Sequence, residues 1–294
     1  MKVWPFLILC IVAMPCSAYA DTLGCADIAF QTDIQHLVSG RKSAPILRVN
    51  VSGKVGVRMA LDTGFSRSLL FSEDNPSNEN STELYDETLS FIPQLGRSIN
   101  LFRAALRAEV RKAARERGFE GIINPQLIYP DGYTVLDLKD WRIVGFKNES
   151  SLRRCYQPGL VVHKTSAETT DNVLGVPVTL DGRVSGRAFV DTGAFISEFY
   201  SPLLAYTDAH TAKEFGFWTA TAEYVSPQVS AGHKVQVGDK VKSLERIVVA
   251  TPDRVSASSA DLASDYIALL GYDALIGSIL IFPPASHGGW EIIF

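Results

Sequence analysis

Apolar and polar positions follow the same pattern at two places along the chain. Residues 49–61 and residues 178–190 each have the pattern of a β-strand, a tight turn and a second β-strand. Ser52-Gly53 and Asp181-Gly182 supply the turns, and Asp-Gly between apolar strands is a strong hairpin signal. The pattern therefore predicts two β-hairpins of one design.

The two hairpins are copies of one segment, because they align without a gap at a constant offset of 129 residues. Each second strand runs directly into Asp-Thr-Gly, at residues 62–64 and 191–193. A second pair of apolar segments follows, Gly121-Ile122-Ile123-Asn124 after the first triplet and Leu269-Leu270-Gly271 after the second. Such self-similarity predicts two related β-rich lobes.

The predicted lobes span residues 21–155 and 156–294, with residues 153–159 as the linker. Each lobe ends in an apolar stretch that predicts a pair of strands. These strands are expected at residues 133–138 and 141–146 in the first lobe and at 278–282 and 290–294 in the second.

Between the paired motifs the two halves differ. The polar and acidic residues 72–90 predict an exposed loop, and apolar residues at helical spacing predict a helix over residues 101–117. Six basic side chains decorate that predicted helix. We interpret them as a solvated face rather than a nucleic-acid or membrane patch, because acidic residues are interspersed and aromatic residues are scarce.

The first twenty residues have the layout of a secretory signal peptide. Lys2 precedes an apolar run of about twelve residues, and Ala18-Tyr19-Ala20 offers a small-residue cleavage site. The alternative is a membrane anchor, for which this run is well short of the roughly twenty residues a spanning helix needs. We therefore predict residues 1–20 to be removed and the protein to be exported, periplasmic or secreted, with no membrane attachment afterwards.

Composition narrows the possible partners and covalent links. A net charge of −4 argues against nucleic acid as a partner, because no overall positive field would hold a polyanion. Cleavage after Ala20 leaves Cys25 and Cys155, which an exported protein can join as a disulfide; two unpaired thiols are the alternative. Two cysteines cannot form a structural zinc site alone, and no metal site is predicted.

The repeated Asp-Thr-Gly is the strongest chemical signal. Asp62 and Asp191 could merely cap tight turns, a role that suits all three residue types. If the two copies face each other, Gly64 and Gly193 let the backbones approach closely. Carboxylates about 3 Å apart then share one proton, so that one member activates a water molecule while the other donates to the carbonyl under attack.

At this point the chain resembles the pepsin-like and retropepsin-like aspartic endopeptidases. The resemblance rests on the two Asp-Thr-Gly triplets, on Ser68 and Ser197 six residues after each aspartate, and on Leu269-Leu270-Gly271 with Asp273. It implies an all-β, bilobal fold of two barrel-like lobes around a substrate cleft. It also implies catalysis by Asp62 and Asp191 without a cofactor, a polypeptide substrate and a monomeric protein.

The resemblance assigns further roles and also meets departures. Thr63 and Thr192 would brace the two loops by hydrogen bonds, and Tyr85 is the candidate for a tyrosine that covers the cleft, although a surface tyrosine is the alternative. Phe65 stands where the family usually has a small or hydroxyl residue, and Asn124 stands where glycine closes the matching motif. Asn tolerates positive φ, so we expect that turn to survive.

Two other functions stay open at the level of sequence. One is a catalytically inactive pepsin-like protein that binds or inhibits peptides, which Phe65 and the unusual first lobe motivate. The other is a processing enzyme that cuts a single partner. Competing chemistries have little support, because the five histidines are scattered and the nucleophile-elbow, zinc-helix and phosphate-loop motifs are absent from the sequence.

Overall fold

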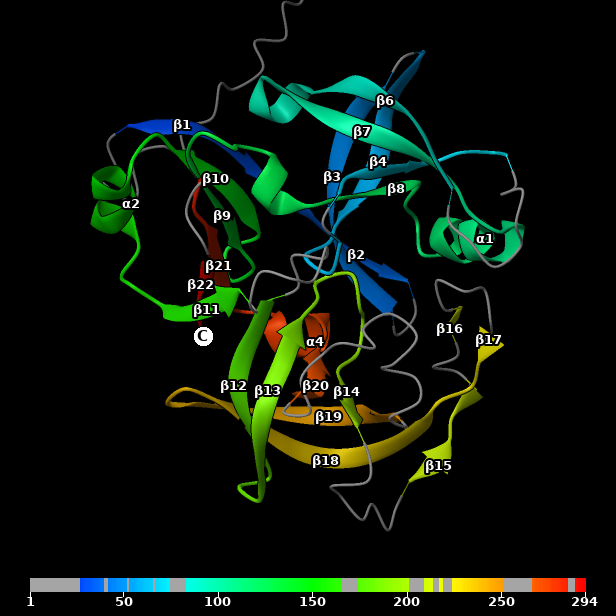
Figure 1. Ribbon diagram of the computed structural model, residues 1–294, viewed down its shortest axis with the longest axis vertical. Helices are drawn as coiled ribbons and strands as arrows, with labels where there is room; N and C mark the ends of the chain where they lie inside the picture. The colour runs from blue at the N-terminus through cyan, green and yellow to red at the C-terminus, as the bar shows by residue number, and fades with distance from the viewer. Residues whose placement is uncertain are drawn as a thin grey trace, which may run out of the picture.

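Two barrel-like lobes and a sheet that both halves build make up the molecule (Figure 1). The computed structural model describes residues 27–39, 42–51, 53–65, 67–74, 83–164, 174–200, 209–213, 217–218, 224–250, 266–284 and 289–294. The predicted signal peptide and Cys25 lie outside the described residues.

Six strands of the first lobe close into a ring. The order is β3 (Lys42–Val51), β4 (Lys54–Leu61), β8 (Gly121–Ile123), β5 (Leu69–Phe71), β7 (Arg97–Ala105) and β6 (Glu83–Ile92), and β6 returns to pair with β3. A further strand, β2 (Gln35–Ser39), extends this sheet beside β3. The β3–β4 hairpin turns at Gly53, whose φ of 77° suits glycine.

The second lobe repeats this ring strand for strand. Its order is β12 (Leu174–Leu180), β13 (Val184–Val190), β20 (Tyr266–Leu270), β14 (Glu198–Tyr200), β19 (Lys240–Ala250) and β18 (Gln228–Val237), and β18 pairs with β12. In both rings the strand before Asp-Thr-Gly runs parallel to the strand of the later apolar motif, as β4 with β8 and β13 with β20. The internal repeat in the sequence is therefore a repeat of whole lobes.

Strands from both halves form a third, shared sheet at the left of Figure 1. Its order is β1 (Ile28–Asp33), β10 (Arg142–Phe146), β9 (Tyr133–Asp137), β21 (Ile279–Phe282), β22 (Trp290–Ile293) and β11 (Leu160–Lys164). The halves meet where β9 pairs antiparallel with β21. The four strands predicted near the lobe ends are confirmed as β9, β10, β21 and β22.

The remaining elements are short. The helices are α1 (Ala108–Glu116), α2 (Glu149–Cys155) and α4 (Tyr272–Leu275), with 3-10 turns at Pro93–Leu95 and Pro125–Leu127, and the small strands are β15 (His210–Thr211), β16 (Phe217–Trp218) and β17 (Tyr224–Val225). The predicted division at residues 155 and 156 falls between α2 and β11, and it stays a prediction. Cys155, at the end of α2, is disulfide-bonded.

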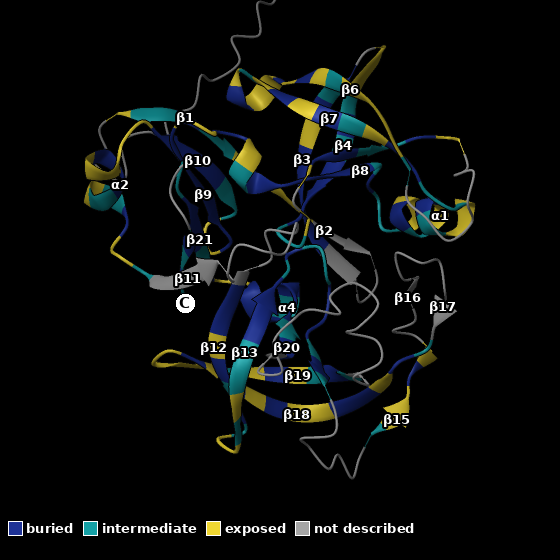
Figure 2. Cartoon of the chain, viewed as in Figure 1, coloured by how far each residue is buried: buried dark blue, intermediate teal, exposed yellow. Residues whose placement is uncertain are grey.

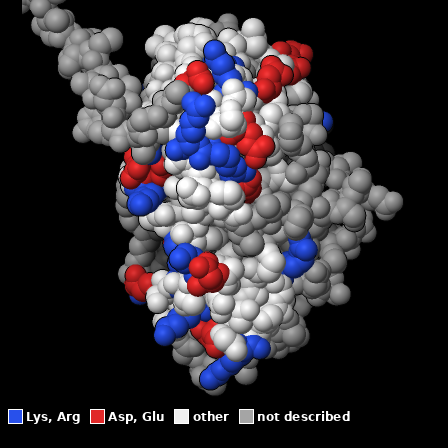
Figure 3. Space-filling model, turned by 90° about the vertical axis from the view of Figure 1, so that its left-hand side faces the viewer, with Lys and Arg blue, Asp and Glu red and all other residues white. Residues whose placement is uncertain are grey.

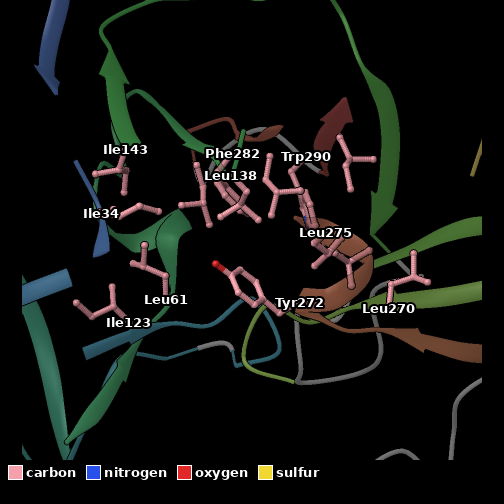
Figure 4. Packing of buried hydrophobic residues seen from close by; sticks show 14 of the residues in the cluster. Ile34, Leu61, Ile123, Leu138, Ile143, Leu270, Tyr272, Leu275, Phe282 and Trp290 are labelled. Carbon is pink, nitrogen blue, oxygen red and sulfur yellow. The ribbon is translucent and has the colours of Figure 1, made fainter. Parts of the chain in front are cut away.

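One apolar core joins the lobes to the shared sheet (Figure 2). Tyr272, fully buried in α4, lies at its centre, among Leu61 from the first lobe, Leu270 from the second and Trp290 from the shared sheet (Figure 4). Each such buried side chain contributes roughly 1.5–3 kcal/mol of transfer free energy. The core therefore fixes how the ends of β4 and β13 face each other.

Two expectations for the first lobe are wrong. Residues 101–105, predicted as the start of a helix, belong to strand β7 (Arg97–Ala105), and the helix covers only Ala108–Glu116. In β7, Ile99 and Leu101 are buried while Ser98 and Asn100 are exposed, a period of two that the helical spacing of its apolar residues concealed. Residues 83–90, the second part of the segment predicted as a loop, belong to β6 (Glu83–Ile92). The polar side chains of β6 reach solvent at least in part, apart from buried Ser90, while its backbone pairs with β7.

Candidate active site

The two aspartates lie at equivalent strand ends. Asp62 follows β4, and its main-chain N–H donates to the carbonyl of Ile123 at 2.8 Å. Asp191 follows β13, and its N–H donates to the carbonyl of Leu270 at 3.0 Å. In each lobe the main-chain hydrogen bonds between the two parallel strands therefore continue up to the aspartate. The repeated sequence segments thus place the two aspartates at equivalent points of the two lobes.

The two threonines lock the loops together. Thr63 Oγ1 donates to Val190 O at 2.8 Å and accepts from Thr192 N at 3.0 Å. Thr192 Oγ1 donates to Leu61 O at 2.7 Å and accepts from Thr63 N at 3.1 Å. Each hydroxyl thus satisfies one donor and one acceptor of the opposite lobe. These are the hydrogen bonds that the predicted bracing roles of Thr63 and Thr192 require.

The two carboxyl groups face each other across closely spaced glycines. Gly64 N donates to Asp62 Oδ1 and Gly193 N donates to Asp191 Oδ1, both at 2.8 Å. A β-carbon added at Gly64 would lie 2.7 Å from Asp191 Cγ, and one added at Gly193 would lie 2.3 Å from Asp62 Oδ2. Any side chain at either glycine would therefore collide with the carboxyl group of the other lobe.

The pairing changes the acid chemistry of Asp62. Its side chain is buried at 6% exposure, and burial raises its pKa well above the ordinary value. The negative charge of Asp191 and a hydrogen bond with Asp191 raise the pKa further, while the N–H of Gly64 and the charge of Arg117 oppose the rise. The arrangement thus favours a carboxyl pair that holds a proton between its members.

Serines six positions after each aspartate hold the later motifs against the loops. Ser68 Oγ accepts from Asn124 N at 3.1 Å, and Ser197 Oγ accepts from Gly271 N at 3.0 Å. Ser197 also donates to Asp273 Oδ1 at 2.7 Å. The serines act on the two lobes in the same way, so the spacing that supported the resemblance has a structural reason.

Asn124 replaces glycine without the positive φ that was expected to matter. Its φ is −74°, and that of Gly271 in the matching motif is −81°, so neither position needs the left-handed conformation. Its side chain instead donates from Nδ2 to Phe65 O at 2.6 Å. In the other lobe, the N–H of Tyr272 donates to Ala194 O at 2.7 Å, so a main-chain group does the corresponding work.

Phe65 is 44% exposed, so it is not packed into the core. Tyr85, the candidate for a cleft-covering tyrosine, lies on β6 at 40% exposure, and its hydroxyl donates to Glu83 Oε2 at 2.9 Å. This contact does not link it to the aspartates, so its covering role stays a prediction.

Sequence reasoning misplaced two basic residues near α1 by assigning them to a solvated face. Arg111 is buried at 7% exposure and donates to Asp74 O at 2.7 Å. Arg117 reaches across to the second lobe, where its Nη2 donates to Gly193 O at 3.1 Å. The only sequence signal for Arg117 is its place just after the helix and just before Gly118, where the chain turns back toward β8.

A second constellation resembles a serine hydrolase triad. Ser230 Oγ lies 2.7 Å from His233 Nε2, and His233 Nδ1 lies 2.8 Å from Asp181 Oδ2. Ser230 is fully buried, however, so its hydroxyl has no access for a substrate carbonyl. Asp181 Oδ1 also accepts from Lys234 N at 2.8 Å, so the group fastens the β12–β13 turn to β18.

Metal-binding clusters and membrane-spanning helices are absent from the described part of the chain. Within it, no group of three or more His, Cys, Asp or Glu side chains is arranged to hold a metal ion. None of its helices has the length and hydropathy to span a membrane. On the face drawn in Figure 3, acidic and basic side chains lie beside one another rather than forming a broad region of one sign.

Comparison with solved structures identifies the fold. A crystal structure of an aspartic proteinase from Irpex lacteus is similar with a TM-score of 0.50, over 89% of this chain and 96% of that chain, at 10% sequence identity. No family model matches the sequence, and no curated protein matches it. The chain therefore has the bilobal, all-β pepsin-like fold, and at this identity the likeness concerns the fold alone.

Proposed function

We propose that the protein is an aspartic endopeptidase in which Asp62 and Asp191 hydrolyse peptide bonds. The observation that carries the proposal is the contact of the two carboxyl groups across Gly64 and Gly193. A fold alone does not give an activity. Two facing acids held by matched hydrogen bonds from both lobes supply the general acid and the general base for one reaction.

The chemistry needs one proton on the pair. The ionised carboxylate takes a proton from a water molecule, whose oxygen attacks the carbonyl carbon of the peptide. The protonated carboxyl donates to the carbonyl oxygen, which gives a neutral tetrahedral diol. A proton then passes from the pair to the amide nitrogen, the carbon–nitrogen bond breaks, and an acid and an amine leave. As the carbon–nitrogen bond breaks, one hydroxyl of the diol returns its proton to the pair, which again holds a single proton, so no cofactor or covalent intermediate is needed.

We expect the enzyme to be an exported monomer that acts on a polypeptide. An extended polypeptide would lie across the aspartates between the lobes, because both lobes contribute equally to the pair. The protein would act as a monomer after export, with residues 1–20 removed and Cys155 paired with Cys25. We expect the protein to bind neither nucleic acid nor, after removal of residues 1–20, a membrane.

A catalytically inactive peptide-binding protein is the second candidate, because Phe65 departs from the pattern of the active family. The facing carboxyl groups and the raised pKa of Asp62 favour the enzyme. A digest of a peptide library from pH 3 to 7, read by mass spectrometry with and without a statine-type inhibitor, separates the two. Inhibitor-sensitive cleavage supports the enzyme, whereas binding of peptides without cleavage at any pH supports the binding protein.

A further inference from the structure

Arg117 connects the first lobe to the active-site loop of the second. It follows α1, and its main-chain N–H donates to Ala113 O at 3.1 Å. This hydrogen bond fixes the backbone of Arg117 at the end of the helix. Its Nη2 then donates to Gly193 O at 3.1 Å. Gly193 is the glycine that faces the Asp62 carboxyl group, so the guanidinium lies beside the acid pair.

The surroundings of the guanidinium are apolar. Its central carbon lies 5.1 Å from the ring centre of Phe119 and 5.4 Å from that of Phe195, one ring from each lobe. Its Nε is buried and has no hydrogen-bond partner among the described residues. A cation in such a place needs a nearby negative charge, because its loss of water is costly.

The acid pair supplies that charge. Burial lowers the pKa of Arg117, and the charges of Asp62 and Asp191 oppose that fall; Arg117 in turn opposes the rise in the pKa of Asp62. Three other titratable groups flank the loops: Glu198 and Tyr200 on β14, and Asp273 on α4, which Ser197 and the N–H of Ala274 bind. Arg117 is the one cation that the described residues bring to the pair.

We infer that Arg117 is a positioning residue that holds the single negative charge of the acid pair, so that peptide hydrolysis continues to lower pH than it would without this cation. The inference rests on the proposed function. The hydrogen bond to Gly193 O fixes the guanidinium beside the pair, and the rings of Phe119 and Phe195 flank it.

The first test compares pH profiles of kcat/KM from pH 3 to 7. Arg117→Gln removes the charge but keeps an N–H donor for Gly193 O, whereas Arg117→Lys keeps the charge. We expect kcat/KM of Arg117→Gln at the acidic end, relative to its own maximum, to fall about tenfold below the same ratio for the unsubstituted protein. Arg117→Lys should stay near the unsubstituted profile. An Arg117→Gln profile of unchanged shape overturns the inference, even if all rates fall.

Arg115→Gln is the matched control. Arg115 lies two residues away on the exposed side of α1 and pairs with Glu73, so its removal deletes the same charge far from the acids. Its profile should equal the unsubstituted one. A shift as large as that of Arg117→Gln would mean that overall charge, not the buried contact, sets the profile, and would overturn the inference.

A second measurement does not need activity. In protein with carbon-13 in the aspartate carboxyl groups, nuclear magnetic resonance follows the titration of the pair, assigned with Asp62→Asn and Asp191→Asn. The titration should move to higher pH in Arg117→Gln and stay in place in Arg115→Gln; an unmoved titration in Arg117→Gln overturns the inference. If the unsubstituted protein cleaves no peptide, the proposed function fails, and this titration still decides the role of Arg117.

Discussion

Thr63 and Thr192 exchange hydrogen bonds across the lobe boundary, each hydroxyl accepting the main-chain N–H of the other. Each also donates to a carbonyl of the opposite strand end, at Val190 and Leu61. The acids follow directly on these strand ends, so their separation depends on this exchange. The two threonines occupy equivalent positions in the sequence repeat, and they therefore face each other in the structure.

Replacing Thr192 by Val should weaken the protein and its activity together. Thr192 is fully buried, and the substitution leaves Leu61 O and Thr63 N without partners, at a cost of roughly 2–4 kcal/mol. Thermal unfolding should begin at least several degrees lower. Thr192→Ser keeps the hydroxyl and should stay close to the unsubstituted protein. Equal melting temperatures for the Val and Ser variants would show that the exchange does not stabilise the loops.

Gly193→Ala should abolish most activity because its β-carbon would lie 2.3 Å from Asp62 Oδ2. Displacing a reacting group by about 1 Å costs on the order of a hundredfold in rate. The control is Gly53→Ala, at an exposed turn with φ of 77° and open space around it. That variant should lose about 1 kcal/mol of stability and no kcat/KM. Normal hydrolysis by Gly193→Ala would contradict the close approach of the loops.

Asp62→Asn should stabilise the protein more at neutral than at acidic pH. The folded-state pKa of Asp62 is raised, so its stability contribution is complete below its ordinary pKa of 3.8 and is lost as pH rises through the folded-state pKa. Because asparagine cannot ionise, the variant does not lose this stability as the pH rises. Melting curves at pH 3 and pH 7 should give a difference between variant and unsubstituted protein that is near zero at pH 3 and a few degrees at pH 7. A difference that is equal at both pH values would refute the raised pKa.

Ser230→Ala tests the alternative nucleophile. Ser230 is buried behind His233, so peptide hydrolysis should be unchanged within about twofold and a fluorophosphonate should not label the protein. Stability should fall by about 1 kcal/mol because a buried hydrogen bond is lost. Loss of hydrolysis with a normal melting temperature would indicate that Ser230, rather than the aspartate pair, performs the reaction.

The sequence predicted the architecture well where a repeat made the signal redundant. The offset between Asp62 and Asp191 gave two lobes with equivalent loops, and apolar alternation placed β9, β10, β21 and β22. The prediction failed in the first lobe at residues 83–90 and 101–105, which have no close match in the repeat. There, polar side chains on an exposed strand looked like loop, and apolar residues that belong to a strand and then a helix fell at helical spacing.

For the site, too, the sequence predicted only the residues that lie inside the repeat. Thr63 and Thr192 lie inside the repeated triplet, so their pairing follows from its symmetry. Arg117 lies outside the segments that the two halves share, and its long side chain reaches a carbonyl 76 residues away. Nothing in local charge patterning separates such an arginine from the solvated basic residues of α1. Ser230, His233 and Asp181 were missed because the fold alone brings the aspartate to the other two.

Cleavage of one selected peptide by the unsubstituted protein, Asp62→Asn and Asp191→Asn tests the central claim most directly. The account predicts that both variants fold, bind the peptide and lose hydrolysis by about a thousandfold or more, because each retains only half of an acid–base pair. Hydrolysis by either variant at the unsubstituted rate would show that the two aspartates do not perform the reaction together.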